Sequence, residues 1–296
     1  MIYVKIHGGL GNQMFQYAAA KSLALKKNVK LGIDLGVFDQ QLESQKYTQR
    51  KFELGDVFSL NGYEMIRAID YNFIIGQERS IISKLKAKFL STTSFFEKSL
   101  EFNSELFENS AASYIEGYFQ SPKYFEDNWS ELKEEFSFRL NPSEKSLEFE
   151  NMLQNGKYIA MHVRRGDYVN KSHVNKIHGL CGIDYYEKGF KYLIDKGTIF
   201  NGIIVFSDDP KWCKKNLKFD LATSFVDWNA GNDSWQDMYL MSQCSAFVIA
   251  NSSFSWWGAY LSQAKNKVVI APKIWFADKE KNKQTSDLFP SSWILV

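Results

Sequence analysis

Apolar runs and helical patterns alternate at the start of the chain. Residues 2–6 and 29–33 are short runs of strand-forming residues, and residues 12–26 between them carry apolar side chains at helical spacing. A strand, a glycine-containing loop, a helix and a second strand in this order are typical of the opening of a doubly wound parallel sheet. The pattern therefore predicts an α/β fold.

The same alternation returns in the second half of the chain. An Asn-Pro-Ser-Glu sequence at 141–144 predicts a turn and the start of a helix, and it marks the best candidate for a domain boundary. We therefore expect two Rossmann-like domains, residues 1–141 and 142–296, facing each other across a ligand-binding cleft. Beyond the boundary the pattern predicts strands at 158–163, 202–206, 247–250 and 267–271, and helices at 185–196, 235–244 and 254–264.

The segment from residue 35 to residue 110 mixes polar and aromatic residues without a clear period. Its basic run at 84–88 is typical of the solvent-exposed face of a helix, and a membrane-surface patch is the alternative. A strand is expected again at 114–119, followed by a helix that starts at 120–122.

Composition narrows the class of protein. With 296 residues, 45% hydrophobic and 24% charged, the chain has the make-up of an ordinary folded protein. Its net charge of +2 argues against a general nucleic-acid-binding protein. The three cysteines form no Cys-x-x-Cys pair, so we expect neither a zinc ribbon nor a disulfide framework. No apolar stretch approaches the roughly 20 residues that cross a bilayer. We expect a cytoplasmic protein with at most peripheral membrane association.

Polar side chains gather just beyond the first strand of the second half. His162 lies near the end of this strand, and Arg164, Arg165 and Asp167 follow it. An arginine guanidinium binds phosphate oxygens in pairs and stays charged at any working pH. Because the carboxyl ends of parallel strands form the ligand crevice of such sheets, the segment predicts a phosphate site. An internal arginine–aspartate pair with a satisfied histidine is the alternative.

Two further strand ends carry similar groups. Asp208 and Asp209 are suited to accept hydrogen bonds from a base or a ribose. With only four histidines and no Asp-x-Asp sequence, we expect no required metal. Asn251, Ser252 and Ser253 precede a helix, with Ser253 as its expected N-cap, and the free N–H groups of a helix start favour an anion.

The loop at residues 7–13 resembles a dinucleotide-binding fingerprint. Asp34 lies near the place where a ribose-binding acid is expected, but Met14 stands where the third glycine is required. A nucleotide-binding loop and a tight strand-to-helix turn both remain open for this segment.

Five segments together resemble the bacterial α-1,2-fucosyltransferases of glycosyltransferase family 11. They occur in the family's order and are GGLGNQMFQY at 8–17, HVRRGDY at 162–168, GIDYY at 182–186, SDD at 207–209 and NSSFSWW at 251–257. The resemblance implies a GT-B fold with GDP-L-fucose as donor, bound by the C-terminal domain. It implies a galactose-containing oligosaccharide or lipid-linked glycan as acceptor, on the side of the N-terminal domain. It also implies transfer with inversion and without an essential metal or cofactor, in O-antigen or other surface-glycan synthesis.

The resemblance assigns roles by position. Arg164 would bind the β-phosphate and stabilise the departing GDP, and Asp167 is the second candidate catalytic residue. The implied donor-binding residues are His162, Asp208 and Phe254 at the guanosine, Ser252 and Ser253 at the phosphates, Gly11, Asn12 and Gln13 closing over the donor, and Arg165, Asp209 and Asn251 beside them.

The base that takes the acceptor proton is not identified. The candidates are His7, Asp34, Glu53 and Asp167, and Asp167 has the alternative role of holding an arginine in place. His173 and His178 lie in a polar loop and are expected at the surface.

Three other functions compete. A fucosyltransferase of another linkage, such as α-1,3, would share the donor motifs. An NAD-dependent oxidoreductase would use the loop at 7–13 and Asp34 but has no use for Arg164 and Arg165. A sugar-binding protein without activity would draw on the aromatic content of 16% and would not need GDP.

Overall fold

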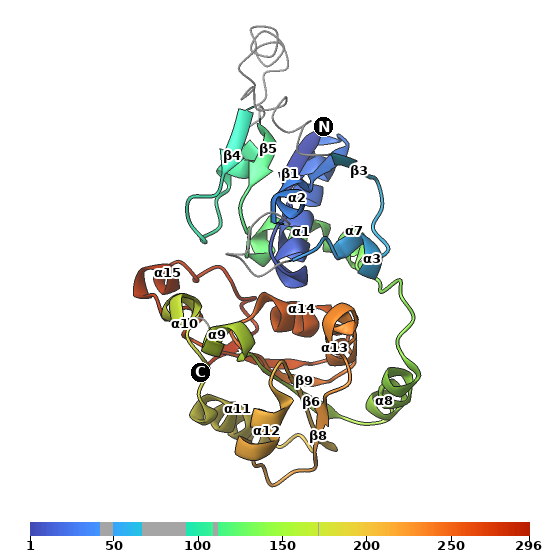
Figure 1. Ribbon diagram of the computed structural model, residues 1–296, viewed down its shortest axis with the longest axis vertical. Coiled ribbons are helices and arrows are strands. Elements are labelled where there is room, and N and C mark those ends of the chain that lie inside the picture. The colour runs from blue at the N-terminus through green and yellow to red at the C-terminus, as the bar shows by residue number, and fades with distance from the viewer. Residues whose placement is uncertain (42–49, 67–92, 109–111, 171) are drawn as a thin grey trace, which may run out of the picture. The chain divides into compact units, whose positions relative to one another are not determined.

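The computed structural model describes residues 1–41, 50–66, 93–108, 112–170 and 172–296, which form two compact units (Figure 1). Unit 1 comprises Met1–Leu140 together with Ser286–Leu288, and unit 2 comprises Asn141–Thr285 together with Phe289–Val296. The basic run at 84–88 lies outside the described residues. Each unit is built on its own parallel sheet, so the expected α/β class with two Rossmann-like domains is confirmed.

The sheet of unit 1 has the strand order β3-β2-β1-β5-β4, and all its pairings are parallel. Its strands are β1 (Ile2–Lys5), β2 (Leu31–Asp34), β3 (Tyr63–Ile66), β4 (Thr93–Phe96) and β5 (Ala112–Glu116). The helices are α1 (Leu10–Lys27), α2 (Gly36–Gln41), α3 (Leu54–Val57), α6 (Glu105–Glu108), η1 (Pro122–Tyr124), η2 (Glu126–Asn128) and α7 (Trp129–Glu135).

Helix α1 connects β1 to β2 as the sequence predicts. It starts two residues earlier and ends one residue later than expected, and Asn28 closes it in the left-handed conformation at φ 51°. An asparagine tolerates this conformation better than most residues, and its N–H bonds to the last carbonyls of the helix. The strand expected at 114–119 ends at Glu116, because Phe119 adopts φ 51° and turns the chain.

The sheet of unit 2 has the order β11-β10-β9-β6-β7-β8 and is also parallel. Its strands are β6 (Tyr158–Val163), β7 (Gly202–Ser207), β8 (Thr223–Val226), β9 (Ala246–Val248), β10 (Val268–Ala271) and β11 (Ile294–Leu295). The helices are α8 (Glu144–Gln154), α9 (Gly166–Asn170), α10 (Ser172–His178), α11 (Ile183–Asp195), α12 (Pro210–Asn216), η3 (Gly231–Asp233), α13 (Trp235–Ser242), α14 (Ser253–Leu261) and α15 (Lys279–Lys283).

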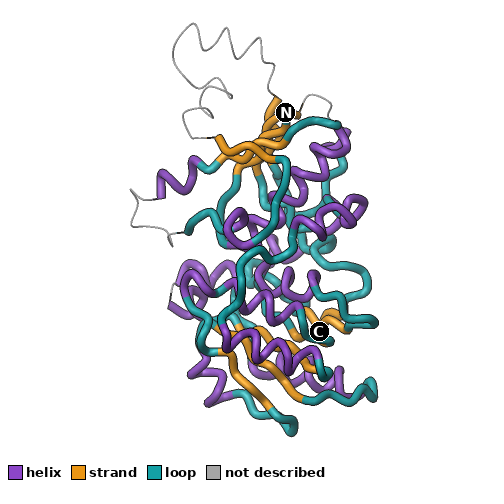
Figure 2. Tube along the Cα trace, turned by 90° about the vertical axis from the view of Figure 1, so that its right-hand side faces the viewer, coloured by secondary structure: helices purple, strands orange, loops and turns teal. Residues whose placement is uncertain are grey.

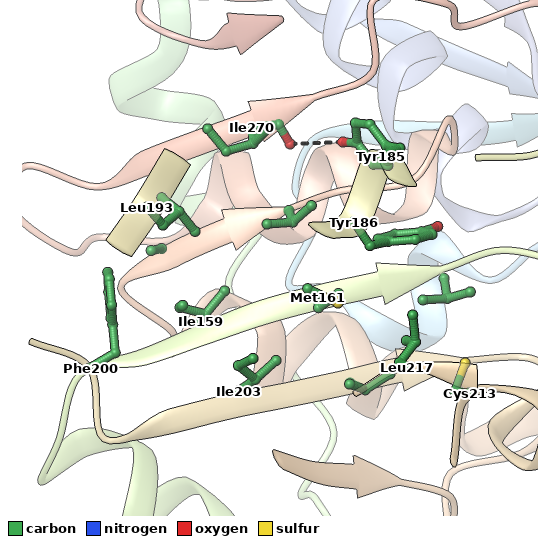
Figure 3. Packing of buried hydrophobic residues seen from close by; sticks show 14 residues of the cluster. Ile159, Met161, Tyr185, Tyr186, Leu193, Phe200, Ile203, Cys213, Leu217 and Ile270 are labelled. Carbon is green, nitrogen blue, oxygen red and sulfur yellow. Dashed lines mark hydrogen bonds between the residues drawn. The ribbon is translucent and has the colours of Figure 1, made fainter. Parts of the chain in front are cut away.

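Helices cover both faces of the unit 2 sheet (Figure 2). Alternate residues of the strands, such as Ile159, Met161 and Ile203, pack under α11 and α12 in one hydrophobic cluster (Figure 3). Gly189 lets α11 approach β9 closely, because a Cβ there would lie 2.8 Å from Val248. The intervening strand residues, among them His162, point to the other face.

The order of the unit 2 strands places a topological switch point between β6 and β9. Counted along the chain within this sheet the order is 3-2-1-4-5-6, so the connections leave β6 and β9 in opposite directions. In such sheets ligands bind beyond the carboxyl ends of the two central strands, where the loops part. The segments that follow β6 and β9 are those at 164–165 and 249–252.

Candidate functional site

One carboxylate at the edge of the unit 2 sheet holds two consecutive arginines. Asp208, directly after β7, lies with Oδ2 3.0 Å from Nη1 of Arg164, and its Oδ1 accepts the backbone N–H of Arg165 at 2.8 Å. Both side chains of the Arg164–Asp208 pair keep a quarter of their surface exposed. The guanidinium is therefore oriented and still accessible to an anion. Gly166 leaves room for this carboxylate, because a Cβ there would lie 2.5 Å from Asp208 Oδ2 and would displace it.

The two arginines have different surroundings. The guanidinium of Arg165 lies 3.9 Å from the ring centroid of Trp212, and its Nε is 3.4 Å from Asp209 Oδ2. Asp209 also caps α12, since its Oδ1 accepts the N–H of Trp212 at 3.1 Å. Arg165 is thus held by Trp212 and Asp209, whereas the guanidinium of Arg164 pairs with Asp208 and keeps a quarter of its side chain exposed.

His162 is a buried, neutral imidazole next to this pair. Its side chain faces α14, with its ring centroid 5.8 Å from that of Phe254. The pKa of His162 is lowered to about 4, chiefly by burial, with Asp208 opposing the shift and Arg164 adding to it. Its Nδ1 is buried without a hydrogen-bond partner among the described residues. An unsatisfied buried nitrogen is costly, so this atom is a candidate ligand contact.

The first turn of α14 lies beyond the other central strand. Ser252, not the expected Ser253, is the N-cap residue, with extended backbone at φ −143° and ψ 127°. Neither serine makes a side-chain cap, so the N–H groups of the first turn lack the usual hydroxyl partner. Both serines are partly exposed. A helix start of this kind favours an anion.

Asn251 has a structural task. The side chain is buried, and its Nδ2 donates to the carbonyls of His178 at 2.8 Å and Trp275 at 3.1 Å. Its Oδ1 lies 3.6 Å from Cys181 Sγ. Its amide therefore joins three segments of unit 2 around the start of α14.

The expected donor residues of unit 1 lie at the start of α1. Gly11 is buried in the helix, and Asn12 Oδ1 accepts from Gln120 at 2.8 Å. Gln13 is buried, and its Nε2 donates to the carbonyls of Gly8 at 2.9 Å and Lys51 at 2.8 Å. Its Oε1 accepts the N–H of Glu53 at 2.9 Å. Gln13 thus clamps two loops, and Asn12 is the more exposed of these side chains.

Asp34 does not suit the binding of a ribose. It is buried at 2% exposure, and its carboxylate accepts from the hydroxyl of Tyr114 at 2.8 Å and the N–H of Gly36 at 2.9 Å. The glycine loop after β1 is therefore a strand-to-helix turn with an internal carboxylate, and this disfavours the NAD-dependent alternative.

Contrary to the prediction from the sequence, His178 does not lie at the surface. The residue is partly buried rather than at the surface, and its ring stacks on that of Tyr168 with centroids 4.9 Å apart and an interplanar angle of 12°. Burial lowers the pKa of His178 to about 4, helped by Lys281 and Arg164. The side chains of Asp167 and His173 lie outside the described part of the chain.

Glu97 is a second residue that the sequence analysis did not identify. It follows β4 in unit 1, and its carboxylate accepts the N–H groups of Tyr118 at 2.6 Å and Phe119 at 2.9 Å. Burial raises the pKa of Glu97 to about 7. Its position after an apolar pair, Phe95-Phe96, is the only signal in the sequence.

Comparison with known proteins gives consistent matches over the whole chain. The family model for glycosyl transferase family 11 matches residues 1–296. An alpha-1,2-colitosyltransferase of Escherichia coli is 33% identical over 302 residues, which cover 100% of this chain and 99% of that protein. The O-antigen biosynthesis glycosyltransferase WbnK of Escherichia coli is 33% identical over 312 residues, covering 99% of each. A galactoside 2-alpha-L-fucosyltransferase of Caenorhabditis elegans is 26% identical over 63% of this chain and 53% of its own length.

Within the described ranges, no helix has the length and apolar character needed to cross a membrane.

Proposed function

The chain belongs to glycosyl transferase family 11, as its resemblance indicated, and we propose that it transfers L-fucose from GDP-L-fucose to a galactoside in an α-1,2 linkage. Relatives named for α-1,2 transfer, for O-antigen biosynthesis and for galactoside fucosylation support this choice. The acceptor is a galactose-containing oligosaccharide or lipid-linked glycan, and the product belongs to a surface polysaccharide such as O-antigen.

The placement of Arg164 supports the proposal most directly. Arg164 follows β6, and the start of α14 follows β9, so a guanidinium and a helix N-terminus border one switch point. A nucleoside diphosphate carries its negative charge where these groups can receive it. His162, with its unpartnered Nδ1, and Phe254 then lie beside the nucleoside.

Transfer develops charge at both ends of the breaking bond. The anomeric carbon becomes oxocarbenium-like while negative charge grows on the β-phosphate. A donor group already aimed at that charge is worth about 3 kcal/mol in transition-state stabilisation. Arg164 and the N–H groups of α14 are the groups assigned to this task, and they would do it without an essential metal. An acceptor hydroxyl attacks from the opposite side, so the configuration inverts.

A second donor is favoured by a specific relative. The relative that matches the chain from end to end is named for the transfer of colitose, so GDP-colitose is the second candidate donor. The phosphate and guanosine contacts proposed above are the same for both donors, so the choice depends on groups that meet the sugar.

A binding assay tests the proposed donor nucleotide, and a transfer assay tests the proposed sugar and linkage. We expect GDP and GDP-L-fucose to raise the melting temperature, with and without EDTA, because a ligand at 100 times its Kd adds about 2.7 kcal/mol to stability. NAD is the matched negative control. Transfer is then measured with GDP-L-fucose and GDP-colitose onto galactosides, and the linkage is determined by NMR. A shift with NAD alone would refute the proposal, and transfer of colitose only would change its donor.

A further inference from the structure

Three aromatic rings extend from Arg164 into unit 2. The guanidinium carbon of Arg164 lies 5.7 Å from the ring centroid of Tyr168, within the range of a cation–π contact. Tyr168 stacks on His178, and the ring centroid of His178 lies 5.4 Å from that of Phe276. The row therefore begins at the proposed phosphate-binding arginine, and the proposed function assigns no task to its members.

Asn251 fixes this row through hydrogen bonds. The Tyr168 hydroxyl donates to the Asn251 carbonyl at 3.3 Å. The amide of the same asparagine donates to the carbonyl of His178 and to that of Trp275, which precedes Phe276. Asn251 is therefore hydrogen-bonded to all three ring-bearing segments: to the side chain of Tyr168, to the backbone of His178 and to the backbone just before Phe276.

The charge state of His178 suits this arrangement. A protonated imidazole beside Arg164 would repel the guanidinium. Because burial lowers the pKa of His178 to about 4, the ring is neutral at pH 7. Tyr168 therefore contacts a neutral ring and a permanent cation.

We propose that Tyr168 and His178 are positioning residues that hold the Arg164 guanidinium where it receives the β-phosphate of the donor. Asp208 orients the guanidinium through Nη1 at 3.0 Å, and Tyr168 limits its movement on another side. An arginine side chain loses rotamer entropy when it is fixed, and packing against the aromatic row would impose part of that loss before the ligand binds. The inference rests on the proposed function.

The test compares GDP with GMP, because GMP lacks the β-phosphate. We expect Tyr168→Leu to weaken GDP binding about tenfold, the size of a cation–π contact of about 1.4 kcal/mol, and to leave GMP binding unchanged. Tyr168→Phe keeps the ring and should preserve the ratio of GDP to GMP affinity. Tyr192→Leu is the matched control, since it removes a tyrosine ring of α11 that lies 5.1 Å from the Nζ of another cation, Lys196.

A double-mutant cycle separates positioning from a general packing effect. In an Arg164→Ala background, Tyr168→Leu should have no further effect on GDP affinity, and His178→Leu should behave in the same way. Equal losses for GDP and GMP, additive effects in the cycle, or an unaffected GDP affinity would each overturn the inference. If the wild-type protein binds GDP and transfers the sugar, such a result leaves the proposed function standing. A wild-type protein that binds no GDP would refute the proposed function itself.

Discussion

At the scale of single residues, Asp208 orients the arginine of the candidate site before a ligand binds. Its carboxylate holds the side chain of Arg164 and the backbone N–H of Arg165 through different oxygens. A diphosphate that binds Arg164 meets a guanidinium that is already desolvated in part and oriented. When the diphosphate binds, Arg164 has two competing anionic partners, the diphosphate and Asp208. The free energy gained is the difference between these two interactions, and it favours the anion that binds the guanidinium through two parallel hydrogen bonds.

Replacing Arg164 tests this role directly. We expect Arg164→Ala to lower kcat about 100- to 1000-fold, because it removes a group aimed at the charge that develops on the leaving phosphate. The rate is measured at saturating donor and acceptor. Lys214→Ala is the control, since it breaks an exposed pair with Asp227 at 2.6 Å. A turnover rate within a few-fold of the wild-type rate would show that Arg164 does not stabilise the leaving phosphate.

His162 makes the free energy of unfolding depend on pH. Its pKa is about 4 in the folded protein and about 6.5 when unfolded, so the folded state binds fewer protons between these values. Its contribution to stability is complete above pH 6.5 and is lost as the pH falls through about 4. The loss amounts to at most about 3 kcal/mol at 1.36 kcal/mol per pKa unit.

Urea unfolding between pH 7 and pH 4 measures this linkage. We expect His162→Gln to unfold with a flatter pH dependence than the wild type, whatever its absolute stability. His178 shifts in the same direction and remains in the variant, so the slope is reduced and not abolished. An unchanged slope would show that His162 is not buried as a neutral group.

At the scale of elements, the fully buried strands could be predicted and the edge strands could not. The strands β6 and β7 match the prediction within one residue, because a strand covered on both faces is a continuous apolar run. Strand β3 lies at an edge, and its Met65 is 64% exposed, so no apolar run marks it. The meeting of Arg164, Arg165 and Asp208 at one edge of the sheet could be predicted from the strand ends. The contact of His178 with Tyr168 could not, because it depends on how α9 and α10 pack.

Gln13 is an element-scale clamp that can be tested. Gln13→Ala removes three hydrogen bonds between the start of α1 and the backbone at Gly8, Lys51 and Glu53. We expect a loss of about 2–3 kcal/mol in the free energy of unfolding, since buried carbonyls and an N–H lose their partner. Gln154→Ala, at an exposed pair with Glu150, should change stability by less than about 0.5 kcal/mol. Equal effects of both changes would contradict the clamp.

At the scale of the whole molecule, the chain returns to unit 1 near its end. Residues 286–288 belong to that unit, where Asp287 pairs with Lys123 at 2.5 Å and accepts the N–H of Phe102 at 3.0 Å. Leu288 is buried at 3% exposure. The two units are therefore joined by more than one passage of the chain, and a cut at the boundary near residue 141 would leave unit 1 incomplete.

Leu288→Ala measures what this return contributes. We expect a loss of about 2–4 kcal/mol, the usual cost of a cavity left by a buried leucine. Hydrogen exchange should rise in unit 1, for instance in α6 and η1. Leu295→Ala is the control, because that leucine is 45% exposed and lies in unit 2. Hydrogen exchange that rises only in unit 2 would show that Leu288 stabilises unit 2 and not unit 1.

The return of the chain to unit 1 at residues 286–288 affects the order in which the two units can fold during synthesis. A ribosome releases the N-terminus first, and domains usually fold in that order during synthesis. Here the residues that complete unit 1 are synthesised after Asn141–Thr285 of unit 2. Unit 1 thus lacks Leu288 until residues 286–288 have been added. Unit 1 is therefore begun first but cannot be completed before most of unit 2 is synthesised, and nascent chains stalled before residue 286 should expose apolar surface to chaperones.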